Sequence, residues 1–335
     1  MAEITTDASS GITIRKRRRN PVVDIVIRMY KTKQLGFISL IIIFILCVVA
    51  IFADQLAPYH WNEVFLLNRL SPPSSEFLLG TDGLGRDLLS RIIYGARISV
   101  TVAMYVQIIH YVISLSIALP SGYFGGKFDL ILQRFIDAWM SLPALVIYLT
   151  VMAILGPGLW QLIIVLGVSS GIGRTRITRS NVMRIREAVY FEAARSIGAP
   201  TSRILWRHVL PNILPLTILG VASGMGGVIL AEASLSFLGF GIPPPYPSWG
   251  GMLSSEGRNY MIKAPWLMIW PGLCLSAVIF SFQMLADALR DLLDPRLRGG
   301  LGSYNLPQEK LKEIAEKKSA ELQRELEKEE EQSRR

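Results

Sequence analysis

The residue types that most often carry enzymatic chemistry are few in this sequence, and their spacing forms no familiar metal-binding pattern. The three histidines, His60, His110 and His208, make no His-Glu-x-x-His pair of the kind that binds zinc. The two cysteines, Cys47 and Cys274, lie inside apolar runs without Cys-x-x-Cys spacing, so we expect two buried, small hydrophobic side chains. The sequence therefore predicts no metal site and no bound cofactor in this chain.

The sequence also contains neither a nucleotide-binding motif nor a hydrolase motif. The stretch Gly125-Gly126-Lys127-Phe128 has the glycines and the lysine of a phosphate-binding loop, but the glycine spacing differs and Phe128 replaces serine or threonine. No Gly-x-Ser-x-Gly turn is present either. We therefore predict that the chain is not an enzyme. If it takes part in an ATP-driven process, another polypeptide must bind ATP and Mg²⁺.

The most informative polar stretch is an arginine-rich segment that follows the fourth long apolar run. It is expected to form two short helices. The first covers 189–197 and ends at Gly198, a natural helix C-cap. The second begins with Thr201 or Ser202 as its N-cap and stops near Pro211. Such a helical knob could press into a partner protein, whereas the alternative is an ordinary connecting loop.

One carboxylate, Glu232, stands in the stretch 209–240, where every other residue is uncharged. A carboxylate within a membrane span is costly and often functional. We expect Glu232 either to pair within a helix bundle, in a structural or gating role, or to line a pathway. His110 is expected to be a hydrogen-bonded bundle residue rather than a proton relay, because its apolar run contains no acidic residue.

The elements that must position these residues are long apolar helices. Charged residues make up only 18% of the chain against about a quarter in a soluble domain, and 51% of the residues are hydrophobic. A bilayer core requires about 20 apolar residues in a helix. Spans are expected at about 35–53, 98–122, 131–155, 159–174, 213–240 and 264–286, with Gly156-Pro157-Gly158 separating the third from the fourth. The sequence therefore predicts an all-α integral membrane protein with six transmembrane helices.

Lysine and arginine distribution indicates the orientation of these spans, because loops on the cytoplasmic side retain positive charge. The alternate segments 1–34, 127–134, 174–207 and 287–335 hold 29 basic residues, whereas 54–97 and 242–263 hold 6. We expect both termini in the cytoplasm and call 54–97 the outer segment. The basic cluster 15–19 favours a cytoplasmic anchor beside the membrane lipid over a nucleic-acid site.

Three regions follow from this pattern: a basic N-terminal segment 1–34, a membrane domain 35–294 with a cytoplasmic loop at 174–212, and a charged tail 295–335. The part 308–335 has nine glutamates against eight lysines and arginines and a thin apolar stripe. A solvated helix is expected there in preference to a docking element, because no wide apolar face could be buried.

Four stretches of this sequence resemble the permeases of one transporter family. The Glu-Ala-Ala run at 192–194, with Gly198 four residues later and Pro211 beyond it, resembles the EAA loop of ABC importer permeases. The stretches 79–87 with 90–91 and 95–97, 230–241 with 247–250, and 287–296 resemble motifs of the dipeptide/oligopeptide/nickel permeases. The resemblance covers roughly residues 30–300 and is closest to the second, C-type, permease subunit, whereas the tail departs from it.

The resemblance implies a type I ABC importer fold and a set of site residues. It places an ATPase-coupling loop at Glu192, Ala193, Ala194, Gly198, Arg203 and Pro211. It places an outer-loop motif at Gly80, Thr81, Asp82, Gly85, Arg86 and Asp87, and a gate or pathway residue at Glu232. The implied partners are a homologous permease, two ATP-binding subunits that carry ATP and Mg²⁺, and an extracytoplasmic solute-binding protein, all at a prokaryotic cell membrane.

The sequence leaves alternatives open for the cargo and for the transport mechanism. Di- or oligopeptides are the expected cargo, and nickel chelates, glutathione or oligosaccharides are alternatives within the same family. An ion-coupled secondary transporter would need further carboxylates within its spans, for which only Glu232 is a candidate. A membrane scaffold without transport would have no use for a capped helical knob between the fourth and fifth spans.

Overall fold

The computed structural model describes residues 4–5, 13–14 and 21–293. The predicted basic cluster 15–19 and the predicted tail helix 308–335 lie outside the described residues. Contacts divide the chain into two units, Met1–Leu289 and Arg290–Arg335, and of the second only the last turn of a helix is described. Near the N-terminus, β1 (Ile4–Thr5) pairs antiparallel with β2 (Thr13–Ile14).

All other regular structure in the described part is helical, which confirms the predicted all-α class. The first half contains α1 (Pro21–Thr32), α2 (Gln34–Ile51), α3 (Ala53–Leu56), the 3₁₀ turn η1 (Leu66–Asn68), α4 (Leu88–Phe124), α5 (Gly126–Met140) and α6 (Ala144–Leu155). The second half contains α7 (Leu159–Arg186), α8 (Val189–Ser196), α9 (Thr201–Arg203), the π-helical η2 (Ile204–Val209), α10 (Leu210–Phe237), α11 (Trp249–Met252), the π-helical η3 (Leu253–Gly257), α12 (Arg258–Tyr260) and α13 (Trp266–Leu293).

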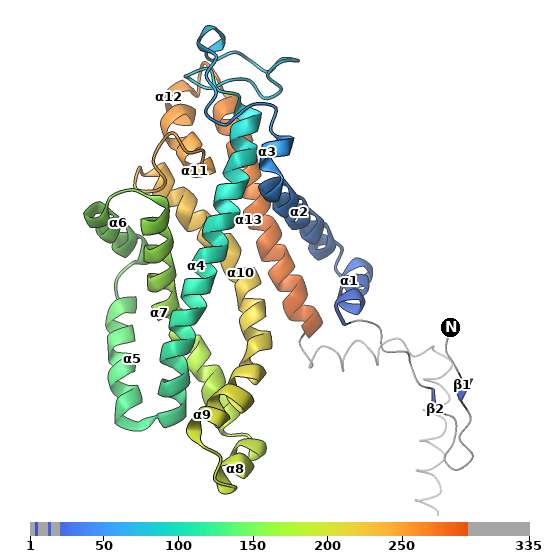
Figure 1. Ribbon diagram of the computed structural model, residues 1–335, viewed down its shortest axis with the longest axis vertical. Helices are drawn as coiled ribbons and strands as arrows, with labels where there is room; N and C mark the ends of the chain where they lie inside the picture. The colour runs from blue at the N-terminus through green and yellow to red at the C-terminus, as the bar shows by residue number, and fades with distance from the viewer. Residues whose placement is uncertain (1–3, 6–12, 15–20, 294–335) are drawn as a thin grey trace, which may run out of the picture. The chain divides into compact units, whose positions relative to one another are not determined.

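The long helices α4, α7 and α10 separate two functional ends of the first unit (Figure 1). The outer segment lies at one end together with α11 and α12, and α8 and α9 lie at the other. Helices α4 and α7 pack closely because Gly167 and Gly171 give α7 a smooth face. A Cβ at Gly167 would lie 2.7 Å from Ile109, and one at Gly171 would lie 2.9 Å from the carbonyl oxygen of His110. Small residues spaced by four let membrane helices approach in this way.

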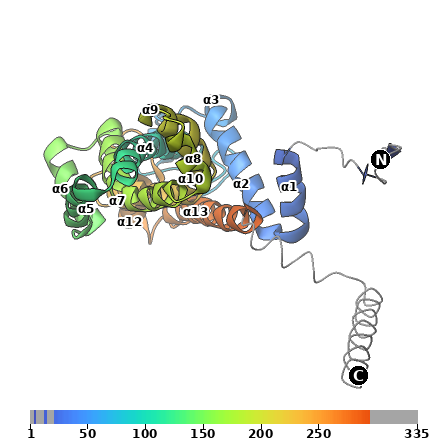
Figure 2. The ribbon, with the colours of Figure 1, turned by 90° about the horizontal axis from the view of Figure 1, so that it is seen from below.

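Seen from below, α8 and α9 lie beside the ends of α4 and α10 (Figure 2). The end of α7 passes into α8 after only two residues, Glu187 and Ala188. The helical knob at this end is therefore attached directly to the long helices rather than carried on a flexible loop.

By length and composition, four described helical stretches can cross a membrane: α2, α4, the continuous run Thr201–Phe237, and α13. The pair α5 and α6 would make a fifth span, but it bends by 83°. The count differs from the predicted six at two places. The predicted span 131–155 is divided between α5 and α6, and the predicted span 159–174 is only the first part of α7.

The bend between α5 and α6 has a local cause. Pro143 precedes α6 and has ψ 127°, so the chain leaves the helical conformation after Ser141. A residue before proline also avoids that conformation. The hydropathy of the third apolar run does not reveal the bend. A hydropathy profile indicates which residues can lie in lipid, but it does not indicate whether the chain changes direction there.

Two predicted boundaries also shift because helices continue past the apolar runs. Helix α4 begins at Leu88, so the last ten residues of the predicted outer segment 54–97 belong to its first turns. Helix α7 continues through five arginines to Arg186, so the predicted loop 174–212 begins as helix. Arginine and serine end an apolar run without ending a helix, since both are compatible with helical backbone.

Candidate functional site

The outer-loop motif is a tight turn that only glycine permits at two positions. Gly80 and Gly85 have φ of +82° and +83°. A Cβ at Gly85 would lie 2.1 Å from the carbonyl oxygen of Phe65, and one at Gly80 would lie 2.8 Å from that of Ser71. Positive φ together with close backbone approach explains glycine at both places. The turn brings Asp82 and Arg86 onto the same side.

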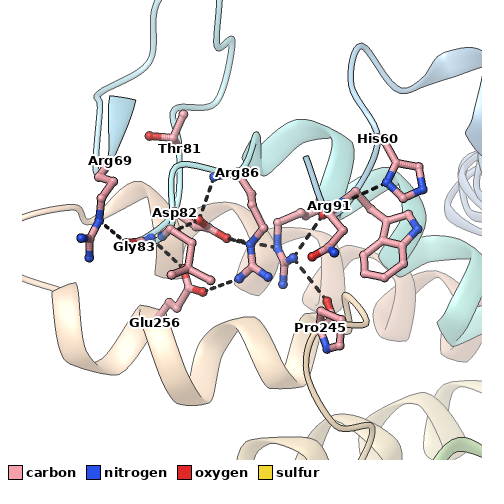
Figure 3. Close-up of polar contacts among 12 residues, drawn as sticks. His60, Arg69, Thr81, Asp82, Gly83, Arg86, Arg91, Pro245 and Glu256 are labelled. Carbon is pink, nitrogen blue, oxygen red and sulfur yellow. Dashed lines mark hydrogen bonds and ion pairs between the residues drawn. The ribbon is translucent and has the colours of Figure 1, made fainter. Parts of the chain in front are cut away.

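Asp82 and Arg86 form the centre of a buried ion cluster (Figure 3). The Arg86 Nε donates to Asp82 Oδ2 at 2.6 Å, and the backbone N–H groups of Leu84 and Arg86 both donate to Asp82 Oδ1 at 2.9 Å. A terminal nitrogen of Arg86 donates to Glu256 Oε1 at 2.8 Å. Since Glu256 lies in η3, this bond joins the outer segment to a part of the chain 170 residues later.

Thr81 and Asp87 hold the two sides of the turn. The Thr81 hydroxyl donates to the carbonyl of Asn68 and accepts from the backbone N–H of Ser71. Asp87 is the N-cap of α4, and its carboxylate accepts from the backbone N–H and the hydroxyl of Ser90 at 2.8 and 2.7 Å. Capping of this kind stabilises a helix start by about 1 kcal/mol. The structure thus brings all six predicted motif residues together, around the first turn of α4.

Two residues of the cluster were given no role by the sequence. Arg91, one turn into α4, lies with its Nε 3.5 Å from Asp82 Oδ2. Glu256 faces the cluster from η3, and its Oε2 accepts from the backbone N–H of Gly83 at 2.9 Å. Burial raises the pKa of Glu256, and the neighbouring Asp82 raises it further. Arg91 lies in the stretch after the motif that also resembles the family's outer loop, whereas Glu256 is distant in sequence and no local pattern marks it.

A cavity of about 760 Å³ opens beside this cluster. Charged groups of Arg69, Asp82, Arg86, Arg91 and Glu256 line one part of it. The other part of the lining is apolar and aromatic. It comes from the loop after α10 and from α12, and it includes Pro243, Pro244, Pro245, Tyr246 and Tyr260. The volume lies within the range of small-molecule sites, about 300–1,000 Å³, so the cavity can accept a small solute.

At the other end of the unit, α8 ends in the glycine turn that the sequence predicts. Gly198 has φ of +72°, its N–H donates to the carbonyl of Arg195 at 3.0 Å, and the Ala199 N–H donates to the carbonyl of Ala194 at 3.2 Å. These two bonds are the pair that closes a Schellman C-cap. We name the residues 189–209, which contain α8, this turn, α9 and η2, the coupling knob.

The second predicted helix differs from the expectation at both of its ends. Neither Thr201 nor Ser202 is its N-cap. Pro200 holds that place without a side-chain cap, and the Thr201 hydroxyl lies 3.2 Å from the hydroxyl of Tyr123. The helix also does not stop near Pro211 but continues through η2 into α10. The π-helical turn before Pro211 widens the backbone, which relieves the clash of a proline ring with the preceding turn.

The coupling knob is anchored by Phe191. Its ring is buried in an apolar cluster with the side chains of Leu119, Val182, Ile204, Val209 and Ile213, which come from α4, α7, η2 and α10. Ala194 is buried beside it, whereas Glu192, Arg203 and Pro211 are exposed. Only the backbone of Ala193 is described. Predicted coupling residues therefore divide into a packed inner face and a solvent-facing outer face.

The solvent-facing part of the knob carries large apolar side chains. Tyr190, Ile197 and Trp206 expose 45, 84 and 67% of their surface. A groove of about 440 Å³ lies where α7 meets the knob and is lined by Met183, Arg186, Glu187, Phe191, Glu192 and Arg195. Exposed aromatic and aliphatic groups beside arginines are typical of a protein-binding surface.

Glu232 lies fully buried in α10, four residues before Ser236. Its Oε1 accepts from the Ser236 hydroxyl at 2.8 Å, and Oε2 has no hydrogen-bond partner among the described residues. The same hydroxyl lies 3.4 Å from the backbone nitrogen of Ile242, in the loop that leaves α10. This geometry suits a structural or gating role at the end of α10, and the pathway role stays a prediction.

Comparisons with known proteins agree with this arrangement. Residues 111–299 match the family described as "Binding-protein-dependent transport system inner membrane component", and residues 23–73 match the "N-terminal TM domain of oligopeptide transport permease C". A "Dipeptide transport system permease protein DppC" of Alkalihalophilus pseudofirmus is 36% identical over 81% of this chain and 89% of its own length. A "Glutathione transport system permease protein GsiD" of Pectobacterium atrosepticum is 35% identical over 81% of this chain and 90% of its own length.

Among solved structures, the MetNI methionine ABC transporter in an inward-facing conformation matches with a TM-score of 0.48 and 17% identity, over 61% of this chain and 97% of its own. The family match extends over more than half of the present chain, and the two permeases are similar along most of their own lengths. This chain belongs to the family of inner membrane components of binding-protein-dependent transport systems.

Proposed function

We propose that this chain is the permease subunit of an ATP-driven importer of short peptides. The observation that carries the proposal is the coupling knob, which presents Tyr190, Ile197 and Trp206 to solvent on a base held by Phe191. Exposed aromatic anchors on a rigid support are what a partner protein binds most strongly. Since Phe191 packs on α4, α7 and α10, a partner that displaces the knob displaces these helices as well.

The partners follow from what the chain itself provides. Two ATP-binding subunits would dock on the coupling knobs and would carry ATP and Mg²⁺. A homologous permease would complete the pathway, and an extracytoplasmic binding protein would deliver the cargo. The family description supports the binding protein, and the names of the dipeptide and glutathione permeases support a peptide cargo.

The membrane placement rests on charge. With 29 basic residues in the predicted inner segments against 6 in the outer ones, the protein would be a multi-pass component of a prokaryotic cell membrane. Both termini and the coupling knob would then face the cytoplasm, where ATP is available. The outer-loop cluster and the cavity beside it would face the side from which cargo arrives.

Reconstitution of the complete transporter tests this function. The chain is purified with its partner subunits in lipid vesicles, and uptake of a labelled dipeptide is measured with and without ATP. We expect ATP-dependent uptake that requires the binding protein. Uptake driven by an ion gradient without an ATPase would instead indicate a secondary transporter.

A glycine substitution tests the coupling role. Gly198→Val places a β-branched residue at φ +72°, where it is strained, although no atom lies within 4 Å of its Cβ. We expect assembly to persist and the peptide imported per ATP to fall. Gly156→Val is the matched control, since Gly156 has φ +81° and equally open surroundings but lies away from the knob. Equal transport per ATP in both variants would contradict the coupling role.

A further inference from the structure

Positive charge is concentrated at the cavity beside the outer-loop cluster. The outer segment 54–97 has only four basic residues, Arg69, Arg86, Arg91 and Arg97, and the first three of them line this one cavity. Basic residues are depleted from outer loops of membrane proteins. Three arginines drawn from a stretch of 23 residues to one hollow therefore need a physical reason.

Arg86 is the arginine of this cavity that pairs closely with both acids. It bonds to Asp82 at 2.6 Å and to Glu256 at 2.8 Å, and both carboxylates also accept backbone N–H groups. The five charged residues that line the cavity are three arginines and two acids, so their formal charge is positive by one. Asp82 and Glu256 thus pair mainly with Arg86, and the positive charges of Arg69 and Arg91 are only partly balanced.

Arg91 keeps donor capacity that the protein does not satisfy well. Its guanidinium lies 3.5 Å from Asp82 Oδ2, 3.3 Å from the carbonyl oxygen of Trp61 and 3.5 Å from that of Pro245. Close arginine–carboxylate bonds measure about 2.7–2.9 Å. A guanidinium that is 8% exposed and held only by such long contacts has lost water without full compensation.

Arg69 is exposed and lines the same cavity, and in Figure 3 it lies on the other side of Asp82 and Glu256 from Arg91. Its Nε donates to the carbonyl oxygen of Gly83 at 2.7 Å, which fixes the guanidinium plane. Within residues 21–293 its terminal nitrogens have no hydrogen-bond partner. Arg91 is therefore the buried guanidinium that can bind an anion in the cavity, and the exposed Arg69 adds positive charge to the same lining.

The rest of the cavity lining indicates which kind of molecule would carry the anionic group. Pro243, Pro244, Tyr246 and Tyr260 provide apolar and aromatic surface, and the Tyr246 ring stacks on Trp61 with centroids 5.3 Å apart. Because Arg91 is almost covered, a thin and flexible molecule reaches it and the surface of a folded protein does not. We propose that this cavity binds the terminal carboxylate of a short peptide through Arg91, with Arg69 adding positive charge to the lining and the peptide's side chains against the proline and tyrosine wall.

This inference rests on the proposed function, since it assigns a site to the peptide cargo of the importer. The experiment uses the complete transporter without the binding protein, in detergent, and measures binding by calorimetry. The two probes are a tripeptide with a free terminal carboxylate and the same tripeptide with a terminal amide. We expect the dissociation constant of the free peptide to be lower than that of the amide by about tenfold or more. A difference of this size corresponds to one charge-assisted hydrogen bond that the amide cannot make.

The variant Arg91→Gln then removes the charge and retains a hydrogen-bonding side chain. It is expected to weaken binding of the free peptide about tenfold or more and to leave binding of the amide unchanged. Asp82 keeps its bonds to Arg86, so the turn remains supported. Arg69→Gln should give a smaller effect in the same direction, because Arg69 is exposed.

Arg97→Gln is the matched control, because Arg97 lies on the same helix and faces α2 and Asp54 instead of the cavity. Equal binding of free peptide and amide by the parent protein, or an equal loss of both in Arg91→Gln, would overturn the inference. ATP-dependent uptake by the parent transporter is measured in parallel. If uptake persists while the carboxylate preference is absent, the site is wrong and the proposed function stands.

Discussion

Asp129 of α5 and Arg179 of α7 form a bidentate ion pair, in which Nε and a terminal nitrogen of the guanidinium donate to the two carboxylate oxygens. The Ser121 hydroxyl of α4 donates to the same carboxylate, so three helices meet at one side chain. A second pair, between Asp137 and Arg176, joins α5 and α7 nearer to the bend. Helix α5 is therefore fixed to α4 and α7, two of the helices that support the coupling knob.

The first prediction concerns this three-helix contact. Asp129→Asn should lower the free energy of unfolding by about 1–3 kcal/mol, because it leaves a poorly exposed guanidinium without its charge partner. Side-chain exposure is 13% for Asp129 and 22% for Arg179. Unfolding of the detergent-solubilised protein in denaturant measures the loss.

Asp137→Asn is the control for that substitution. The Asp137 and Arg176 side chains are 35 and 55% exposed, so their pair should contribute only about 0–1 kcal/mol. The exchange of both charges, Asp129→Arg with Arg179→Asp, should recover part of the loss. A larger effect at Asp137 than at Asp129 would show that the contact with α4 is unimportant.

The second prediction separates backbone strain from steric overlap at the outer-loop turn. Gly85→Ala combines φ of +83° with a Cβ that would lie 2.1 Å from the Phe65 carbonyl oxygen. Gly239→Ala has the same strain at φ +86° but no atom within 4 Å of its Cβ. We expect about 1–2 kcal/mol of destabilisation at Gly239 and clearly more at Gly85, measured by thermal unfolding. Equal losses would contradict the close approach of Phe65 to the turn.

The third prediction concerns the solvent-facing aromatic groups of the knob. Phe191→Ala should destabilise the knob by about 3–5 kcal/mol, because Phe191 is buried in the cluster with Leu119 and Ile204. Trp206→Ala should hardly affect folding, since Trp206 is exposed, but it should weaken association with the ATP-binding subunit. Hydrogen exchange measures the first effect and co-purification the second. Unchanged association in Trp206→Ala would remove Trp206 from the docking surface.

The fourth prediction is a pH dependence. The Asp54 carboxylate accepts from Arg97 at 3.0 Å, and the bonds from Arg97 and Tyr94 hold the pKa of Asp54 below its ordinary value of 3.8. A carboxyl with a lowered pKa contributes stability above its unfolded pKa and loses it as pH falls through the folded pKa. The stability difference between the parent protein and Asp54→Asn should therefore be complete above pH 3.8 and should decline as the pH falls below 3.8 towards the folded-state pKa. A difference that stays constant as the pH falls below 3.8 would exclude ionisation as its source.

The fifth prediction concerns orientation. A cysteine at the fully exposed Leu67 of η1 should react with a membrane-impermeant reagent from outside the cell, and one at Ile197 of the knob only from inside. Both positions are solvent-facing, so a lack of reaction reflects the membrane and not burial. Reaction of Leu67→Cys from the cytoplasm would reverse the proposed topology.

The parts of this structure that the sequence could predict are those with a local cause. Apolar runs located α2, α4, α10 and α13, and the glycine at 198 located the end of α8. The bend before α6 was missed, since a proline within an apolar run can kink or end a helix and hydropathy does not distinguish these outcomes. The continuation of the helix past Pro211 was missed because it depends on the π-helical turn before it.

The candidate site shows the same division. Gly80, Gly85 and Asp87 were identified through the family resemblance, and the structure gives their physical reason as positive φ at the two glycines and an N-cap at Asp87. The meeting of Arg86 with Glu256 was not, since it depends on how two segments 170 residues apart pack together. The cavity between them has the same origin, and no pattern along the chain would have located it.

The helical run from Thr201 to Phe237, which includes the π-helical η2 and Pro215, is long enough to act as a lever. At 1.5 Å per residue its 37 residues extend about 55 Å, well beyond the thickness of a bilayer core of about 30 Å. Trp206 stands near one end of this rod, and Glu232 and Ser236 stand near the other. A tilt of about 10° about one end would move the opposite end by roughly 10 Å, a distance comparable to the diameter of a helix. When the run moves as one body, a small rotation at the Trp206 end thereby becomes a displacement of about one helix diameter at the Glu232 end.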